Sequence, residues 1–170
     1  MGQDVFITSL GEFLPGLPIQ NEDMEKHLGL ILGKESKAKR VILAQNKILT
    51  RHYALDNQGN VLHQNYEMAA KALENCLAKS QIDKSQIEYL ASATTLSDVL
   101  VPGIAALVQG EAKIPRTDIA SFGGVCASSV AALKSAYAQI KSGLVKTAAV
   151  TGSEFASRHF QEKNSKESTL

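Results

Sequence analysis

The strongest constraint in this sequence is a repeated alternation between short apolar runs and longer amphipathic stretches. The short runs are rich in alanine, valine and isoleucine, whereas the longer stretches carry apolar residues at three- and four-residue spacing, as in Tyr66, Leu73 and Leu77. The first pattern is typical of buried strands and the second of helices with one apolar stripe. Strands are predicted at 87–93, 118–122 and 147–152, with helices at 66–77, at 102–111 and, after Gly123-Gly124, over the stretch that contains residues 130–140 and ends at a C-cap, Gly143. This order predicts a largely parallel sheet covered by helices.

The first third of the chain is expected to add smaller elements. Val5–Leu10 is predicted to be a first buried strand, and residues 21–33 a short helix. The polar, lysine-rich stretch 34–40 is interpreted as a basic loop, or alternatively as a docking site for an acidic partner. Residues 51–55 and 61–62 flank turn-forming residues and are predicted to form a hairpin.

Composition excludes several classes of protein. The 170 residues have the length of one domain, and 44% hydrophobic residues are too many for a disordered chain. A net charge of +1 argues against binding nucleic acid or an anionic membrane surface. Apolar runs are too short to cross a bilayer, and the start lacks the pattern of a signal peptide. Because Cys76 and Cys126 lie in different contexts and need not pair, a reduced, cytoplasmic protein is expected.

The segment with the clearest chemistry is Gly123-Gly124-Val125-Cys126, which lies between a predicted strand and a predicted helix. A sharp turn there would bring Cys126 to the carboxyl edge of the sheet, where open α/β folds bind ligands. Glycines permit unusual backbone angles, and the positive end of a helix dipole favours a thiolate nucleophile. The backbone N–H of Cys126 would be available to an oxyanion. Cys76, on an apolar helical stripe, is interpreted as a small core residue instead.

Two other interpretations of this turn remain open. Cys126 could be the nucleophile of a cysteine hydrolase of the α/β type, because the turn is similar to a nucleophile elbow. That class needs a later acid and histidine, and only His159 follows Cys126. The chain could also be a non-catalytic partner subunit of another enzyme, although such partners typically lose the nucleophile.

Taken together, the motifs resemble the N-terminal half of thiolase-like condensing enzymes, most closely the β-ketoacyl-acyl-carrier-protein synthase III family. The segments that carry the resemblance, in addition to the cysteine turn, are Gly11–Pro15, Asn21–Glu25, Arg51-His52, Ala93–Thr95 with Val101-Pro102, and Gly152–Glu154. The resemblance implies an α/β, thiolase-like fold with a mixed, largely parallel five-stranded sheet covered by helices. It divides the chain into a nucleophile domain, 1–156, and a polar tail or connection, 157–170.

The resemblance also implies a mechanism. Cys126 would accept an acyl group from a thioester, and a malonyl-type thioester would then lose CO2 and attack that acyl group. Val101 would reach across a homodimer to the partner's acyl pocket, and Gly124 and Ser153 would contact substrate. No metal and no cofactor are implied, because the substrates are thioesters of coenzyme A or of acyl carrier protein. The products would belong to fatty-acid or polyketide-like biosynthesis.

Two departures from the family pattern bear on these expectations. The family completes its site with a His and an Asn from a second half, whereas His27, His52, His63 and His159 lie in no matching motif. We therefore expect the C-terminal half of the fold to supply both groups. Members that accept coenzyme A also carry a Trp and an Arg before the hairpin. This chain contains no Trp, so an acyl carrier protein is at least as good a candidate donor.

Overall fold

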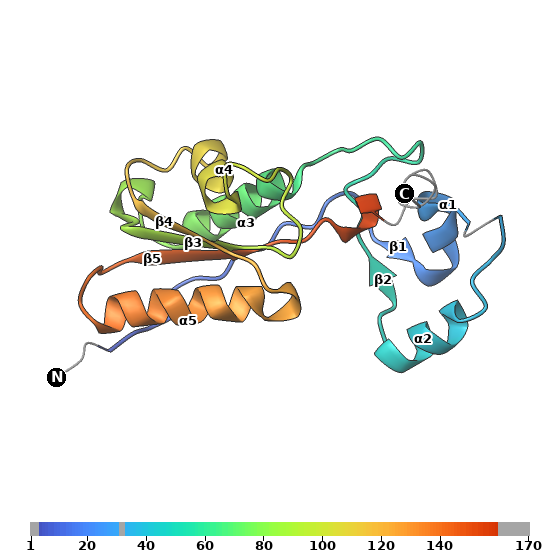
Figure 1. The fold of residues 1–170 in the computed structure, drawn as a ribbon, viewed down its shortest axis with the longest axis horizontal. Coiled ribbons are helices and arrows are strands. Elements are labelled where there is room, and N and C mark those ends of the chain that lie inside the picture. Colours follow the sequence, from blue (N-terminus) through green and yellow to red (C-terminus); the bar gives the residue numbers. More distant parts are fainter. Residues whose placement is uncertain (1–3, 31–32, 160–170) are drawn as a thin grey trace. The chain divides into compact units, whose positions relative to one another are not determined.

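The computed structural model describes residues 4–30 and 33–159 (Figure 1). The chain divides into two compact units, which are taken one at a time below. The sheet-bearing unit consists of Met1–Phe13 and Asn65–Glu154. The second unit consists of Leu14–Gln64 and Phe155–Leu170.

A three-stranded parallel sheet forms the centre of the sheet-bearing unit. Strand β3 (Tyr89–Ala93) lies between β4 (Asp118–Phe122) and β5 (Ala148–Gly152) and pairs with both of them in parallel. The register places Ala93 opposite Phe122 on one side and opposite Gly152 on the other. All three strands therefore end at the same level, which brings the segments that follow them to one edge of the sheet.

Helices cover both faces of this sheet, as Figure 1 shows. Helices α3 (Asn65–Lys79) and α4 (Ile104–Glu111) pack on one face, and α5 (Ser128–Lys141) packs on the other. Successive side chains of a strand point to opposite faces. Leu90 accordingly packs with α3 and α4, while Tyr89 and Ala91 pack with α5. All five residues of β3 are buried, as expected for a strand covered on both sides.

Helix α5 also carries apolar side chains on the surface that faces away from the sheet. Val130, Leu133 and Tyr137 are exposed, whereas Ala132 and Ala136 are buried against the strands. The small alanines let the helix approach the sheet closely. The larger apolar residues are left without cover from the described part of the chain.

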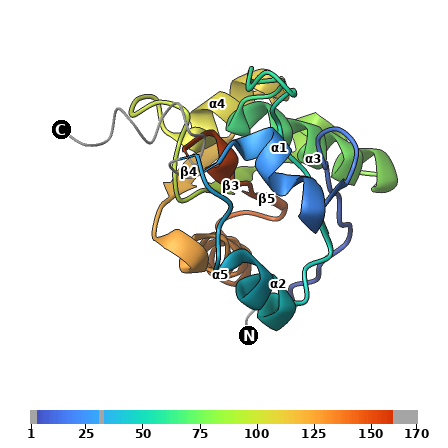
Figure 2. The ribbon, with the colours of Figure 1, turned by 90° about the vertical axis from the view of Figure 1, so that its right-hand side faces the viewer.

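The second unit is built from short elements, and Figure 2 shows its helices α1 and α2 in a second view. Strand β1 (Ile19–Gln20) pairs antiparallel with β2 (Thr50–Arg51). Between them come the 3-10 turn η1 (Asn21–Asp23) and the helices α1 (Met24–Leu28) and α2 (Lys39–Asn46). A further 3-10 turn, η4, spans Ala156–His159.

Glu25 connects the two short helices of this unit. Its carboxylate accepts hydrogen bonds from the Ser36 backbone N–H, at 2.9 Å, and from Lys39 Nζ, also at 2.9 Å. These two bonds hold the pKa of Glu25 below its usual value. The start of α2 is thus fixed by a contact with a residue that lies 14 positions earlier.

The predicted α/β class, parallel sheet and covering helices are confirmed, and 118–122 is a strand with the predicted bounds. The strand predicted at Val5–Leu10 is wrong: the segment pairs with no strand in the described residues, and Phe6, Ile7 and Leu10 are exposed. It is fixed to α3 instead, because Ser9 Oγ donates to the Cys76 carbonyl oxygen at 2.8 Å. The strands therefore form sheets of three and two rather than one sheet of five.

Three smaller expectations for the first third also need correction. The predicted hairpin is reduced to a single bridge between Leu55 and Val61. The helix expected over 21–33 is confined to η1 and α1, and residues 31–32 lie outside the described residues. Helix α2 starts inside the stretch interpreted as a loop. Of the predicted polar tail, residues 157–159 belong to η4, and 160–170 lie outside the described residues.

A search for membrane-spanning segments in the described ranges finds no helix of sufficient length and apolar character.

We predict that Leu90→Ala strongly destabilises the fold. Leu90 is 0% exposed and lies in the cluster between β3, α3 and α4. Truncating a buried leucine removes apolar burial and leaves a cavity, at a cost of about 2–5 kcal/mol in the free energy of unfolding. Urea titration followed by circular dichroism measures the change. Leu144→Ala, at an exposed position, is the control and should change stability by no more than about 0.5 kcal/mol. Equal effects at the two positions would contradict the assigned core.

Candidate active site

The carboxyl edge of the parallel sheet collects the segments that follow β3, β4 and β5. Two backbone hydrogen bonds continue the ladder past the strand ends. The Thr94 N–H donates to the Phe122 carbonyl oxygen at 3.1 Å, and the Ser153 N–H donates to the Ala93 carbonyl oxygen at 3.1 Å. The turn that bears Cys126 follows β4 directly, at the edge where open α/β sheets bind their ligands.

The turn between β4 and α5 has an unusual backbone. Gly124 has φ 135° and ψ 38°, a region that residues with a side chain rarely adopt. Val125 follows with φ 54°, an outlier for a β-branched residue. Strained residues of this kind persist only where the surrounding structure holds them, and they cluster at functional sites. The chain is thereby redirected within two residues of Cys126.

Cys126 lies in the 3-10 turn η3 (Val125–Ala127), which leads directly into α5. Its side chain is exposed, and its thiol is free. The turn is held by Ser128, whose Oγ donates to the Val125 carbonyl oxygen at 2.9 Å. Backbone N–H groups in the first turn of a helix have no partner within the helix. Here the preceding turn supplies partners, because the N–H groups of Ala127 and Ser128 donate to the carbonyl oxygens of Gly124 and Val125.

The first turn of α5 also lies close against the end of β5. A Cβ added to Gly152 would stand 2.4 Å from Ser129 Oγ and 3.1 Å from its Cβ, so a larger residue here would force Ser129 to shift. The contact fixes the position of the turn relative to Ser153, the next residue along the chain.

A buried asparagine joins the ends of β3 and β5. Asn65, the first residue of α3, is 0% exposed, and its Nδ2 donates to Thr94 Oγ1 at 2.8 Å. Its Oδ1 accepts a hydrogen bond of 2.6 Å from Ser153 Oγ. Both sides of the Asn65 amide are thus used, one for each strand end.

Two carboxylates complete this polar network. Asp98 accepts hydrogen bonds from the backbone N–H groups of Asn65, at 3.0 Å, and Tyr66, at 2.9 Å, and so caps the N-terminus of α3. Glu154 accepts a bond from the Thr95 backbone N–H, which links the segment after β5 to the segment after β3. The loop edge next to Cys126 is therefore a connected hydrogen-bonded structure.

The residues predicted as site residues all belong to segments that leave the same edge of the sheet. Cys126 and Gly124 lie in the turn after β4, Ser153 follows β5, and Val101 lies in the loop between β3 and α4. The Ser153 hydroxyl donates to Asn65, so its hydrogen is already engaged within the protein. Val101 is 81% exposed. Cys76 is half-buried on α3.

Histidine is absent from the sheet-bearing unit by sequence, since all four histidines belong to residues 14–64 and 155–170. Two of them have assigned partners. His52 Nδ1 lies 3.0 Å from the Pro15 carbonyl oxygen, and His159 Nε2 accepts a bond from Arg158 Nε at 3.2 Å. Among residues 4–30 and 33–159, no group of three or more His, Cys, Asp or Glu side chains is arranged to hold a metal ion.

Sequence reasoning missed the network around Asn65. Ser153 and Glu154 were identified only through a family motif, and the helix was expected to begin one residue later, at Tyr66. An Asn directly before an apolar-periodic run is a signal for a helix start. Nothing in the sequence indicates that its side chain bonds residues 29 and 88 positions away.

We predict that Asn65→Ala lowers the free energy of unfolding by about 2–4 kcal/mol, because it removes the side-chain hydrogen bonds of a buried amide to Thr94 and Ser153 and leaves a cavity in its place. Asn75→Ala on the same helix is the matched control, since Asn75 is exposed and makes one bond, to the Glu12 carbonyl oxygen. The control should cost less than about 1 kcal/mol. Thermal unfolding of both variants measures the difference, and similar losses would show that the Asn65 bonds contribute little.

Comparison with known proteins finds relatives that are similar in sequence over most of this chain. β-Ketoacyl-[acyl-carrier-protein] synthase III of Neisseria meningitidis serogroup B is 31% identical over 156 residues, covering 89% of this chain and 44% of the relative. The Ehrlichia canis protein of the same name is 32% identical over 152 residues, with the same coverage. The chain thus spans less than half the length of these curated relatives.

Solved structures agree in fold. 3-Oxoacyl-[acyl-carrier-protein] synthase III from Aquifex aeolicus VF5 has a TM-score of 0.74 at 23% identity, covering 92% of this chain and 47% of the other. AbyA1, a tetronic acid condensing enzyme, has a TM-score of 0.76 at 22% identity, covering 89% and 46%. At these identities the likeness establishes a thiolase-like fold.

The family described as thiolase, N-terminal domain, matches residues 56–169, a range that contains the parallel sheet, the Asn65 network and the cysteine turn. Because this match covers about two thirds of the sequence, the chain belongs to the thiolase N-terminal domain family.

Proposed function

We propose that this chain is the nucleophile-bearing half of a β-ketoacyl synthase III-like condensing enzyme, with Cys126 as the residue that is acylated. The observation that carries the proposal is the position of Cys126: exposed, in the turn between β4 and α5, at the edge where three parallel strands end together. The similarity to β-ketoacyl-[acyl-carrier-protein] synthase III over 89% of the chain supports it.

The first half-reaction is a transfer of an acyl group between thiols. The sulfur of Cys126 attacks the carbonyl carbon of an acyl thioester, and a tetrahedral intermediate with a negatively charged oxygen forms. The backbone N–H of Cys126 is the group that we expect to stabilise this oxyanion, because the N–H groups of Ala127 and Ser128 already bond carbonyl oxygens of the turn. When the intermediate collapses, the donor leaves as a free thiol and takes up a proton, so that the acyl group remains on Cys126.

The second half-reaction makes the carbon–carbon bond. A malonyl-type thioester loses CO2, and the carbanion that remains attacks the acyl carbon. The bond from that carbon to the sulfur of Cys126 breaks, and the thiol is restored on protonation. Neither step consumes an oxidant or a reductant, so thioesters alone suffice as reactants.

This scheme assigns roles outside the chain. The sheet-bearing unit contains no histidine, so we propose that a C-terminal half of the same fold supplies the His and Asn that act on the malonyl group. Assembly as a homodimer would give Val101 its role at the partner's acyl pocket, because this valine is 81% exposed in a loop. Gly124 would let substrate approach the turn closely, and Ser153 would contribute its position beside the turn rather than a free hydroxyl.

The donor is the remaining part of the proposal. Residues 41–45, where coenzyme A-dependent members carry Trp and Arg, form part of α2 and contain neither. We therefore propose acyl carrier protein as a donor alongside coenzyme A. We propose that the protein acts in the reducing cytoplasm, which is consistent with its two free cysteines. We further propose that its product enters fatty-acid or polyketide-like biosynthesis.

We predict that iodoacetamide labels Cys126 before Cys76. Cys126 is exposed at the end of a turn, whereas Cys76 is half-buried on α3. Peptide mapping after short exposures measures the order, and Cys76→Ser should leave the rate at Cys126 unchanged. Equal rates in the folded chain would contradict the exposed position assigned to Cys126.

The central prediction is that incubation with an acyl thioester adds one acyl group to Cys126. Intact-mass spectrometry of the 170-residue chain should show this single addition with acyl-carrier-protein or coenzyme A donors. The addition should disappear in Cys126→Ala and persist in Cys76→Ala. Because carbon–carbon bond formation is assigned to both halves, condensation with malonyl thioester is tested with the C-terminal half present.

The same experiment separates the rival functions. A stable acyl-enzyme that waits for malonyl thioester supports the condensing enzyme. Steady release of free acid by Cys126 would identify a cysteine hydrolase and overturn the proposal. No adduct under any donor would leave the chain as a non-catalytic partner subunit.

A further inference from the structure

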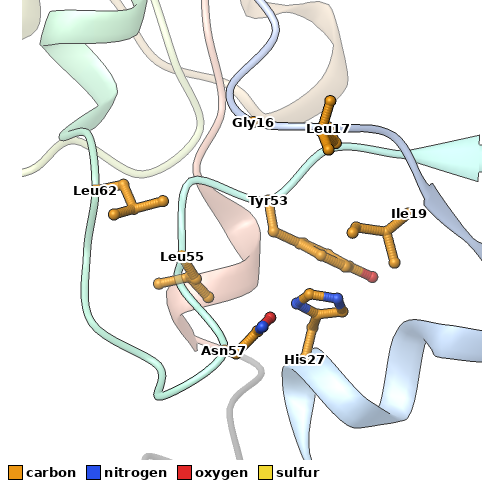
Figure 3. Close-up of a pocket in the computed structure, with 8 residues that line it drawn as sticks. All are labelled: Gly16, Leu17, Ile19, His27, Tyr53, Leu55, Asn57 and Leu62. Atoms are coloured by element: carbon orange, nitrogen blue, oxygen red, sulfur yellow. The ribbon is translucent and has the colours of Figure 1, made fainter.

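The second unit contains a cavity of about 390 Å3, which lies entirely among residues 16–62 (Figure 3). This volume falls in the range of about 300–1,000 Å3 that is typical of small-molecule sites. Four of the eight residues that line it are leucine or isoleucine: Leu17, Ile19, Leu55 and Leu62. Leu17 and Leu62 are exposed and form its rim, so the cavity is open to solvent on that side.

Two polar groups in the wall of this cavity have no partner. The hydroxyl of Tyr53 and Nδ1 of His27 are both buried, and neither forms a hydrogen bond within the described ranges. Tyr53 as a whole is only 8% exposed. Figure 3 shows the phenol and the imidazole next to each other, and their ring centroids are 5.9 Å apart. Burying polar groups without partners costs free energy, so this arrangement favours a ligand that bonds both.

The phenol is held in its protonated, donating form. Burial raises the pKa of Tyr53, and the nearby charge of Arg51 only partly opposes this shift. At neutral pH the Tyr53 hydroxyl is therefore a hydrogen-bond donor. His27 is also a donor at Nδ1 in the tautomer that carries its hydrogen there.

The charge of Arg51 determines which ligand head suits this pair of donors. Its Nη1 donates to Asn21 Oδ1 and to Met24 Sδ, both of which are neutral groups. In the part of the chain that the structure describes, no carboxylate forms an ion pair with Arg51. Arg51 does not line the cavity, but its positive charge acts on Tyr53 and so favours a negatively charged acceptor there over a positively charged one.

We propose that this cavity is a binding site for a small aliphatic monocarboxylate. The carboxylate accepts hydrogen bonds from Tyr53 and His27 in the field of Arg51, and the alkyl chain packs against the leucine and isoleucine wall toward the rim. The site involves no residue of the sheet-bearing unit and no acylation of Cys126, so it is independent of the condensing activity.

Octanoate is the probe for this site, titrated into the whole 170-residue chain and followed by calorimetry and by 1H–15N spectra. Saturable binding of one molecule is expected, with spectral changes among residues 14–64. Tyr53→Phe removes one charge-assisted hydrogen bond and should weaken binding by about tenfold or more. Tyr137→Phe, on the exposed surface of α5, is the matched control and should leave the affinity unchanged.

Octanamide, which lacks the charge, should bind at least about tenfold more weakly than octanoate.

A second variant tests the site without touching the core. Leu17 is 81% exposed, so Leu17→Trp adds bulk at the rim while preserving the fold, and it should abolish octanoate binding by covering the cavity. Octanoate binding that survives both Tyr53→Phe and Leu17→Trp, or spectral changes confined to the exposed face of α5, would overturn the site. Equal affinity for octanamide would overturn the assignment to carboxylates. Binding retained in Cys126→Ala supports the site even if acylation of Cys126 fails.

Discussion

Strand β3 hydrogen-bonds to a parallel neighbour on each side, and the positions of the other groups in the sheet-bearing unit depend on this pairing. Parallel pairing needs a crossover after each strand, and these crossovers supply the helices on the two faces. The common register ends all three strands together, with Ala93 between Phe122 and Gly152. A shift of one residue would reverse the faces of β3 and move Leu90 from the α3–α4 cluster to α5.

The sheet-bearing unit is the part of the fold that could be predicted from sequence. Its strands are short apolar runs and its helices carry regular apolar stripes, so local patterns and tertiary structure agree. The cysteine turn was also predictable, because two glycines followed by a cysteine stand between a strand pattern and a helix pattern. Residues 118–122 even have the predicted bounds.

The remaining features depend on contacts between residues distant in sequence. Helix α2 begins at Lys39, whose side chain bonds Glu25, a residue 14 positions earlier in the sequence. Val5–Leu10 has strand-like composition, but a hydrogen bond from Ser9 to the Cys76 carbonyl oxygen ties the segment to α3, a contact that composition does not report. The positive φ of Val125 could not be predicted, because a β-branched residue rarely adopts it and only the tertiary structure can hold it there.

Helix α5 carries apolar side chains both toward the sheet and toward solvent, which affects the behaviour of the isolated chain in solution. The small alanines of α5 face the sheet, whereas the larger apolar residues Val130, Leu133 and Tyr137 meet water, and exposed apolar side chains of this kind favour association. With a net charge of only +1, long-range repulsion between molecules is weak. Concentrated preparations of the chain are therefore expected to self-associate through this helix, and mild detergent or dilution should reverse the association.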